Sequence, residues 1–429
     1  NHVLYGGDFG DKPNLKAFCL NGVVFSDRSV SAKYQEVKYV YAPVWITQKG
    51  DEIWVKNHHS HLSLEGFSCQ YQVTKNGALV QEGELKMPSV QPGDSAKLCS
   101  LHDFKAYKNT DSRLNISVIS QQGVEVGREQ IALSDNLYEA GWKLAADAMK
   151  RYKSSRRLAT LSTAELLARN ISVIPQFFRA PTDNDKSFGN WIAKDWKKTH
   201  LDSTLSAIPL KDGEYVYHYG EDGASDKAGS SASAKSGGNI RLRLEVAPQQ
   251  DGFVDVKATY SFEGNLPELP RLGLMMKLPR VAYDQVKWYG RGPWENYPDR
   301  KQSCPIGWYE SSVEDQFTHY PRPQDNGNHE DCSYIELTNK NGKNALQVIA
   351  VGDTPLSFSA LPYSVADLYA ARHDFELKQS GNPNLRYTYL SLDCAVLGLG
   401  NSSCGPGVLK KYAIDKTRSY TLHFKMRIL

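Results

Sequence analysis

Short runs of alternating apolar and polar residues, separated by Gly, Asn, Pro and Asp, constrain the fold of this chain more than any other feature. Successive side chains of a β-strand point to opposite faces, so each run predicts a strand with one buried face. Between residues 31 and 136 the runs are 37–41, 45–47, 51–57, 67–73, 114–119 and 124–132. Their spacing is typical of an immunoglobulin-like β-sandwich, in which we expect Trp54, Tyr71 and Val118 to face inward.

The β pattern resumes near residue 240 and continues to residue 429, with alternating runs such as 240–246, 253–262 and 420–426. So many strands pack most naturally as a large antiparallel sandwich of two layers. The predicted fold class is therefore mainly β, with an immunoglobulin-like β-sandwich followed by a larger antiparallel sandwich.

Three kinds of segment interrupt the strands. Residues 140–152 and 162–169 are rich in Ala, Leu, Lys and Glu with helical periodicity. A short helix is predicted where Ile192 and Trp196 share one face. Residues 220–238 are rich in Gly, Ser, Ala and Asp, which predicts a mobile surface loop.

Composition and charge exclude several classes of function. A chain of 429 residues is expected to form two or three domains, and it holds no apolar run long enough to span a bilayer. Because the net charge of +3 is small and Lys and Arg are spread along the chain, we expect neither nucleic acid nor a membrane as a partner. The seven cysteines form no CxxC pair, which argues against a disulfide framework or a zinc site. They leave the compartment, cytoplasmic or periplasmic, undecided.

Two further features concern the N-terminus and a histidine cluster. The chain begins at Asn1 without an initiator Met, a basic segment or an apolar segment, so we expect that further residues precede it. His58, His59 and His61 stand together, but no carboxylate follows at the spacing of a metal ligand. We interpret this cluster as an exposed loop.

Residues 288–300, WYGRGPWENYPDR, form the most distinctive loop of the chain. Glycine and proline stop regular strand pairing there, and the Trp and Tyr rings supply flat faces with polar tips. Arg291, Glu295 and Asp299 can pin the loop through charged hydrogen bonds. The segment is consistent with a sugar-binding surface and equally with a salt-bridged structural corner.

This loop also resembles the GxGPxENYxDR signature of glycoside hydrolase family 2 β-galactosidases. Four more stretches resemble the same family in the same order, namely YGGDFGDKPN and FCLNGVVFSDR within 5–28, FFRAPTDNDK at 177–186, FSALPYSVADL at 358–368 and LGLGNSSCGPGVL at 397–409. The resemblance implies a C-terminal remnant of a catalytic (β/α)8 barrel at 1–30 and an immunoglobulin-like sandwich at 31–136. Residues 137–429 would then form the β-galactosidase small-chain domain, a super-sandwich like that of galactose mutarotases. Its usual opening strands and GxL turn are not found in 137–175, so either this segment is helical or part of the first sheet is missing.

The resemblance also implies an activity. Relatives hydrolyse terminal β-D-galactosides such as lactose with retention, using two glutamates that the barrel carries before its final segment. Neither glutamate motif occurs here, so we expect no catalytic residue in this chain and no activity of the chain alone. We interpret the carboxylates of the matched motifs as loop-fixing groups that bond backbone N–H groups or arginines, namely Asp183, Asp185, Glu295 and Asp299. The expected partners are a β-galactoside sugar, an N-terminal catalytic part or subunit, and further copies in a homo-oligomer.

Several residues carry secondary roles by the same resemblance. Phe18, through its carbonyl, and Asn21, through its side chain, match two ligands of a sodium ion that holds the galactose 6-hydroxyl. The third ligand, an aspartate, lies outside this chain, so sodium is a candidate cofactor with an incomplete site. Magnesium belongs to the parent enzyme, and its ligands are not in this chain. Asn21, Cys404 and His329 are the candidate substrate contacts, although His329 and Glu330 are also typical of an exposed loop.

Two other functions are compatible with the sequence. A mutarotase or epimerase would need a His acid and a carboxylate base that converge on the anomeric carbon. The available groups are His319, His329, His373, Glu295 and Asp393. A non-catalytic carbohydrate-binding module is the third hypothesis, because the chain has many aromatic loops.

Overall fold

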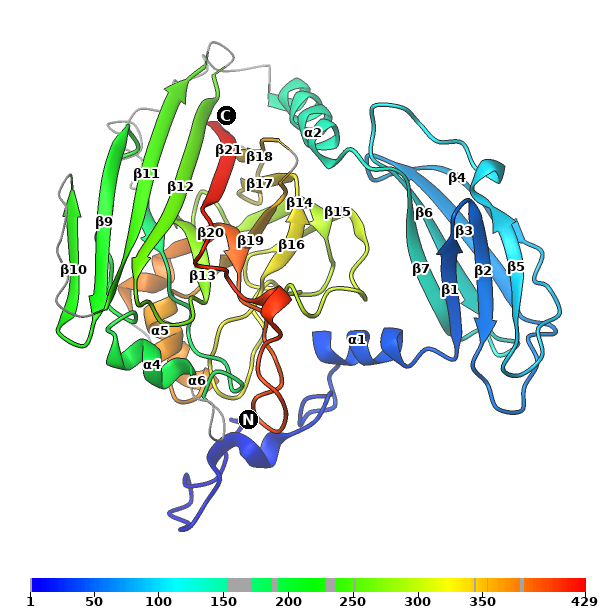
Figure 1. The fold of residues 1–429 in the computed structure, drawn as a ribbon, viewed down its shortest axis with the longest axis horizontal. Coiled ribbons are helices and arrows are strands. Elements are labelled where there is room, and N and C mark those ends of the chain that lie inside the picture. Colours follow the sequence, from blue (N-terminus) through cyan, green and yellow to red (C-terminus); the bar gives the residue numbers. More distant parts are fainter. Residues whose placement is uncertain are drawn as a thin grey trace.

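The computed structural model describes residues 2–152, 171–186, 192–228, 237–249, 252–342, 345–352, 354–378 and 382–429. The chain forms two β-sandwiches that lie side by side, with an N-terminal segment beneath the larger one (Figure 1). The fold is mainly β, as predicted, and every strand pair within the described ranges is antiparallel. No helix in the described ranges combines the length and the apolar character needed to cross a bilayer.

The smaller sandwich has sheets of three and four strands. One sheet has the order β1 (Val44–Lys49), β2 (Glu52–Asn57), β5 (Ser95–Ser100), and the other β4 (Ala78–Leu85), β3 (Ser68–Lys75), β6 (Ser112–Ile119), β7 (Glu125–Ser134). Val118 is fully buried and Tyr71 packs against the same core, as predicted. The prediction for Trp54 was wrong, because its neighbours Ile53 and Val55 are the buried residues of β2 and Trp54 therefore points to the other face.

The larger sandwich has a sheet of nine strands and a sheet of five. The nine are β10 (Gly223–Ala228), β9 (Gly213–Gly220), β11 (Gly238–Pro248), β12 (Val254–Gly264), β21 (Tyr420–Ile428), β18 (Ala345–Ala350), β17 (Tyr334–Thr338), β14 (Gln285–Arg291) and β15 (Ile306–Ser312). The five are β16 (His329–Cys332), β19 (Leu356–Leu361), β20 (Tyr387–Val396), β13 (Arg271–Pro279) and β8 (Ser172–Gln176). One core joins Leu244, Val256 and Phe424 of the first sheet to Leu274 and Leu392 of the second.

Short helices cover the sandwiches and their connections. They are α1 (Ala32–Val40), α2 (Leu137–Tyr152), α4 (Ile192–Lys198), α5 (Val365–Ala370) and α6 (Asp374–Leu377), with 3-10 turns η1 (Lys16–Leu20), η2 (Leu101–Asp103), η3 (Pro383–Arg386) and η4 (Lys410–Tyr412). Helix α2 confirms the first predicted helical pattern and packs against the nine-stranded sheet, where Arg427 donates to the carbonyl of Ala145 (3.0 Å). The second pattern, at 162–169, lies outside the described residues. Helix α4 confirms the third, and its Trp196 is fully buried.

Two predictions of local structure were wrong. Residues 37–41 were expected to form a strand, but 37–40 belong to α1 and Tyr41 is its C-cap. The helix forms because Ser31 caps it by accepting from the N–H of Tyr34 (3.3 Å) and Ala, Lys, Gln and Glu follow. The expected loop at 220–238 contains β10, which pairs with β9 across a tight turn at Gly223. Residues 229–236 of that stretch are not among those described.

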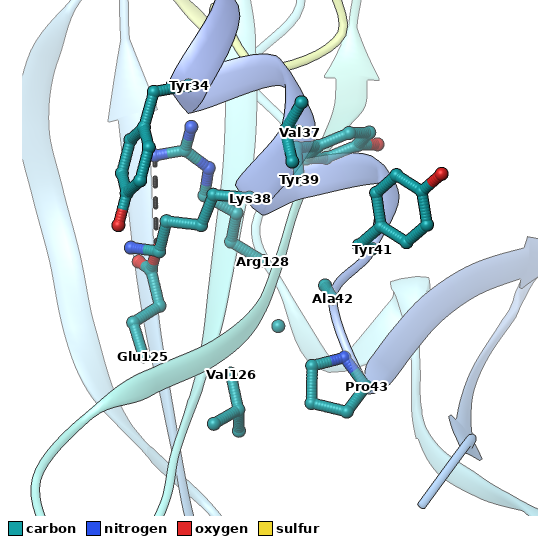
Figure 2. Close-up of a pocket in the computed structure, with 11 residues that line it drawn as sticks. Tyr34, Val37, Lys38, Tyr39, Tyr41, Ala42, Pro43, Glu125, Val126 and Arg128 are labelled. Carbon is teal, nitrogen blue, oxygen red and sulfur yellow. Dashed lines mark hydrogen bonds and ion pairs between the residues drawn. The ribbon is translucent and has the colours of Figure 1, made fainter. Parts of the chain in front are cut away.

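Helix α1 lies over strand β7 and lines a groove with it. Figure 2 shows Tyr34, Lys38 and Tyr39 of the helix above the strand. Lys38 pairs with Glu125 (2.8 Å), and the Tyr39 hydroxyl donates to Glu129 (2.7 Å). These contacts fix the helix, and with it the N-terminal segment, against the smaller sandwich.

The two sandwiches are tied together by buried polar groups. The hydroxyl of Tyr289 on β14 donates to Asp111 of the smaller sandwich (2.6 Å), and Asp111 also accepts two bonds from Arg113 (2.6 and 3.0 Å). Nearby, Gln130 on β7 accepts from the N–H of Ile306 and donates to its carbonyl (2.7 and 2.9 Å). Specific hydrogen bonds therefore hold the two sandwiches together.

Replacing Tyr289 with phenylalanine is expected to lower the free energy of unfolding by about 1.5–3 kcal/mol, because a buried hydrogen bond to a charged group is lost. Urea denaturation measures the change. Tyr41→Phe is the matched control, since Tyr41 is 81% exposed and its loss of a hydroxyl should stay within about 0.5 kcal/mol. Equal effects of the two substitutions would show that the Tyr289 hydroxyl does not hold the sandwiches together.

Candidate functional site

A hollow of about 670 Å³ lies between the N-terminal segment and the loops at one end of the larger sandwich. Its walls come from four of the stretches singled out in the sequence and from the loop before β16. The charged or amide-bearing lining residues are Asn14, Lys16, Asn21, Lys33, Asp183, Asn184, Lys186, Glu295, Arg300, Arg322, Gln324 and Asp325. Residues far apart in the chain thus meet at one place, and this place is the candidate functional site.

Glu295 holds the distinctive 288–300 loop against the loop before β16. Its carboxylate accepts from Arg300 (2.9 Å), from the hydroxyl of Tyr320 (2.5 Å) and from the N–H of Gly327 (2.8 Å). Burial works to raise the pKa of Glu295, but the charge of Arg300 and these hydrogen bonds outweigh it and lower that pKa. Glu295 is therefore an ionised group that organises the loop.

Arg179 joins the 177–186 stretch to the 397–409 stretch. The side chain is fully buried and bonds Asp185 through two nitrogens (2.8 and 3.0 Å). It also donates to the carbonyls of Leu397 (2.8 Å) and Gly398 (3.2 Å). Four of the five N–H groups of this buried fork therefore have an acceptor.

Two more side chains complete the connection to 397–409. Asp299 accepts from the N–H groups of Leu399 (2.8 Å) and Gly400 (2.7 Å). Asn184 donates to the carbonyl of Gly400 (2.6 Å) and accepts from the N–H of Ser403 (3.0 Å). The prediction that Asp185, Glu295 and Asp299 fix loops is confirmed by these bonds.

The N-terminal segment closes one side of the hollow. Asp8 pairs with His373 (2.8 Å), whose ring stacks on Tyr5 with centroids 4.5 Å apart. Phe25 lies near Tyr320, with ring centroids 5.7 Å apart. The segment is therefore attached to the larger sandwich at two places.

The expected sodium ligands lie at this site, but the oxygens present do not make a cation site by themselves. Phe18 and Asn21 both line the hollow, on and just after η1. Hard cations take about six or more oxygen ligands, and these two residues account for two. The ammonium of Lys33 donates to the carbonyl of Gly22 (3.1 Å), next to Asn21, where it would repel a cation. Sodium therefore stays a prediction that depends on ligands from outside this chain.

His329 and Glu330 were predicted to lie on an exposed loop, and this was wrong. Both are on β16 of the five-stranded sheet, and His329 is only 1% exposed. Its ring nitrogens lie 3.1 Å from the carbonyl of Arg291 and 2.6 Å from the side-chain oxygen of Gln316. Burial lowers the pKa of His329 to about 4. His329 is not among the residues that line the hollow.

Burial raises the pKa of Glu330 to about 7, well above the ordinary value of 4.5. Because the folded state holds this proton more tightly than the unfolded state, the contribution of Glu330 to stability is present below pH 4.5 and lost as the pH rises through 7. We expect Glu330→Gln to stabilise the protein relative to wild type more at pH 8 than at pH 5. Urea denaturation at both pH values tests this, with the exposed Glu84→Gln as control. A difference for Glu330→Gln that does not change with pH would contradict it.

Cys404 lies on an exposed turn, where its N–H donates to the carbonyl of Asn401 (3.0 Å). The neighbouring Ser403, rather than Cys404, lines the hollow.

The histidines required for a mutarotase do not converge here, since His319 pairs with Asp374 (2.9 Å) and neither it nor His373 lines the hollow. No group of three or more His, Cys, Asp or Glu in the described part of the chain could hold a metal ion, and the cluster at 58–61 is no exception.

Sequence reasoning missed the positive side chains of the hollow. Lys186 ends the FFRAPTDNDK stretch and Arg322 stands in the loop before β16, but neither was singled out. The signal that could have found Lys186 was its place within a family stretch. Nothing in the sequence indicated that both side chains would face one hollow.

Profiles of known protein families match most of the chain. The profile described as "Beta galactosidase small chain" matches residues 149–427, which is more than half of the chain. This chain belongs to the β-galactosidases of glycoside hydrolase family 2. The profiles "Beta-galactosidase, domain 4" and "Glycosyl hydrolases family 2, TIM barrel domain" match residues 53–134 and 1–46.

Curated relatives resemble the chain along almost all of its length. The β-galactosidase of Priestia megaterium is 27% identical and is matched over 100% of this chain and 43% of its own length. That of Lactobacillus delbrueckii subsp. bulgaricus is 28% identical over the same shares. The chain therefore spans less than half the length of these family members. An exo-chitosanase of Amycolatopsis orientalis overlaps with 12% identity over 68% of this chain and 24% of its own, at a TM-score of 0.20, which is too slight to bear on the fold.

Proposed function

We propose that this chain is the supporting C-terminal region of a retaining β-galactosidase that hydrolyses terminal β-D-galactosides such as lactose. In this proposal the two catalytic glutamates belong to an N-terminal region. The present chain supplies loops that contact the sugar and surfaces that assemble the enzyme. Its partners are the galactoside, the N-terminal region and further copies of the enzyme.

The observation that carries the proposal is the meeting of the family stretches around one hollow. The N-terminal segment, Asp183, Glu295 and Ser403 reach this hollow from positions up to hundreds of residues apart. Retaining hydrolysis needs two carboxyl groups about 5–5.5 Å apart, one of them free to attack the sugar. The buried carboxylates described here already accept several hydrogen bonds each, as the Glu295 and Asp185 networks illustrate. They suit a structural role better than the roles of acid and nucleophile.

Complementation tests the proposal. The 429-residue chain and the N-terminal region of its own enzyme are expressed separately, and hydrolysis of p-nitrophenyl β-D-galactoside is followed before and after mixing. We expect turnover only in the mixture, and Lys211→Gln, at an exposed site that does not line the hollow, should restore it as well as wild type does. A mixture that associates but shows no turnover would reject the proposed function.

A further inference from the structure

The hollow carries more positive charge than its own acidic groups can balance. Its basic residues are Lys16, Lys33, Lys186, Arg300 and Arg322, and its acidic residues are Asp183, Glu295 and Asp325. Two of the acids are already engaged, because Glu295 pairs with Arg300 (2.9 Å) and Asp325 faces the buried Arg271 (3.4 Å). Asp183 alone remains beside several cations.

Four of the five cations have no acidic partner within the described ranges. Lys16, Lys33, Lys186 and Arg322 form no ion pair there within 4.0 Å. Burial, followed by the charge of Arg322, lowers the pKa of Lys186 to about 8. Lys33 behaves in the same way, because burial and the charge of Arg300 lower its pKa. The positive side chains that line the hollow therefore repel one another and are partly desolvated, and both effects cost free energy.

Arg300 also lines the hollow, but Glu295 engages its charge. One nitrogen donates to the carboxylate (2.9 Å) and to the carbonyl (3.4 Å) of Glu295. Its Nε has no hydrogen-bond partner among the described residues, and it is buried away from the hollow as well as from solvent. The cations that can meet a ligand are therefore the lysines and Arg322.

We propose that this hollow binds a sugar that carries an anionic group, namely a phosphate, sulfate or carboxylate. Lys186 and Arg322 contact the anion. A free anion would occupy a small part of about 670 Å³, whereas a substituted sugar fits the range of ordinary ligand pockets. The assignment of a sugar rests on the proposed function, but the assignment of an anion rests on the charges alone.

Calorimetry on the 429-residue chain tests this without any turnover, so its outcome is separate from that of complementation. The ligands are galactose, galactose 6-phosphate, galactose 6-sulfate, galacturonate and inorganic phosphate. We expect at least one anionic sugar to bind about tenfold or more tightly than galactose, and more tightly than inorganic phosphate. The affinity should fall as salt is raised, because ions screen the cations.

Two variants and a control locate the binding. Arg322→Gln and Lys186→Gln are each expected to weaken the anionic sugar about tenfold, while Lys211→Gln, with the same change in net charge, should leave it unchanged. Anionic sugars that bind no more tightly than galactose would overturn the proposal. So would equal binding of inorganic phosphate, or a loss in all three variants. If the anions do not bind and Arg322→Gln instead weakens association with the N-terminal region, the cations serve an acidic protein surface and the proposal is wrong.

Discussion

Arg179→Met is expected to lower the free energy of unfolding by about 3–5 kcal/mol. The substitution leaves the buried carboxylate of Asp185 without its charged partner, and such an uncompensated charge is among the most costly changes in a protein interior. The carbonyls of Leu397 and Gly398 lose their donors as well. Urea denaturation monitored by tryptophan fluorescence measures the loss.

Arg241→Met is the matched control for this prediction. Arg241 and Glu263 form the same two-pronged pair (2.6 and 2.9 Å), but their side chains are 36% and 49% exposed. Solvent screens such a pair, so its loss should cost about 1 kcal/mol or less. A second test is the double variant Arg179→Met/Asp185→Leu, which should recover part of the stability because the buried charge is also removed. Equal losses for Arg179→Met and Arg241→Met would contradict this interpretation.

Gly290→Ala is expected to destabilise the protein by about 3 kcal/mol. A Cβ at Gly290 would lie 2.3 Å from the sulfur of Cys332 and 2.7 Å from its Cα, so strand β14 would have to move away from β16. Both residues are in the buried part of the larger sandwich, where overpacking of this kind is poorly relieved. The free energy of unfolding and the melting temperature report the effect.

Gly307 provides a close comparison, because it is the register partner of Gly290 on the neighbouring strand β15. A Cβ there would meet the hydroxyl end of Tyr309 at 3.1 Å, and that side chain can shift. We therefore expect Gly307→Ala to cost about 1 kcal/mol or less. If both alanines cost the same, close approach of β14 and β16 is not what requires glycine at Gly290.

Alternation was sufficient to predict the strands where one face is buried. Strand β2 illustrates both the strength and the limit, since the strand was correct but Trp54 was assigned to the wrong face. Trp54 was predicted to face inward because large aromatic residues are commonly buried. In the structure Ile53 and Val55 are the buried residues of this strand. Helix α1 was missed because a run of only five residues, 37–41, fits a strand and a helix equally well. The N-terminal cap at Ser31 favours the helix.

The candidate site was predictable in its parts but not in its assembly. Quoted motifs identified Glu295, Asp185 and Asp299 as loop-fixing groups, and the hydrogen bonds confirm that role. The burial of His329 was not predictable, because it depends on which sheet receives a four-residue strand. The convergence of Lys186 and Arg322 depends on loops from different strands, which a single sequence does not pair.

We propose that the groups which cleave the glycosidic bond lie outside these 429 residues. The most direct test is to incubate the purified chain alone with p-nitrophenyl β-D-galactoside and follow release of nitrophenol. The predicted result is no turnover above the buffer rate. Turnover that co-purifies with the chain and is lost in Glu295→Gln would contradict the claim, because it would place an essential carboxylate within the hollow.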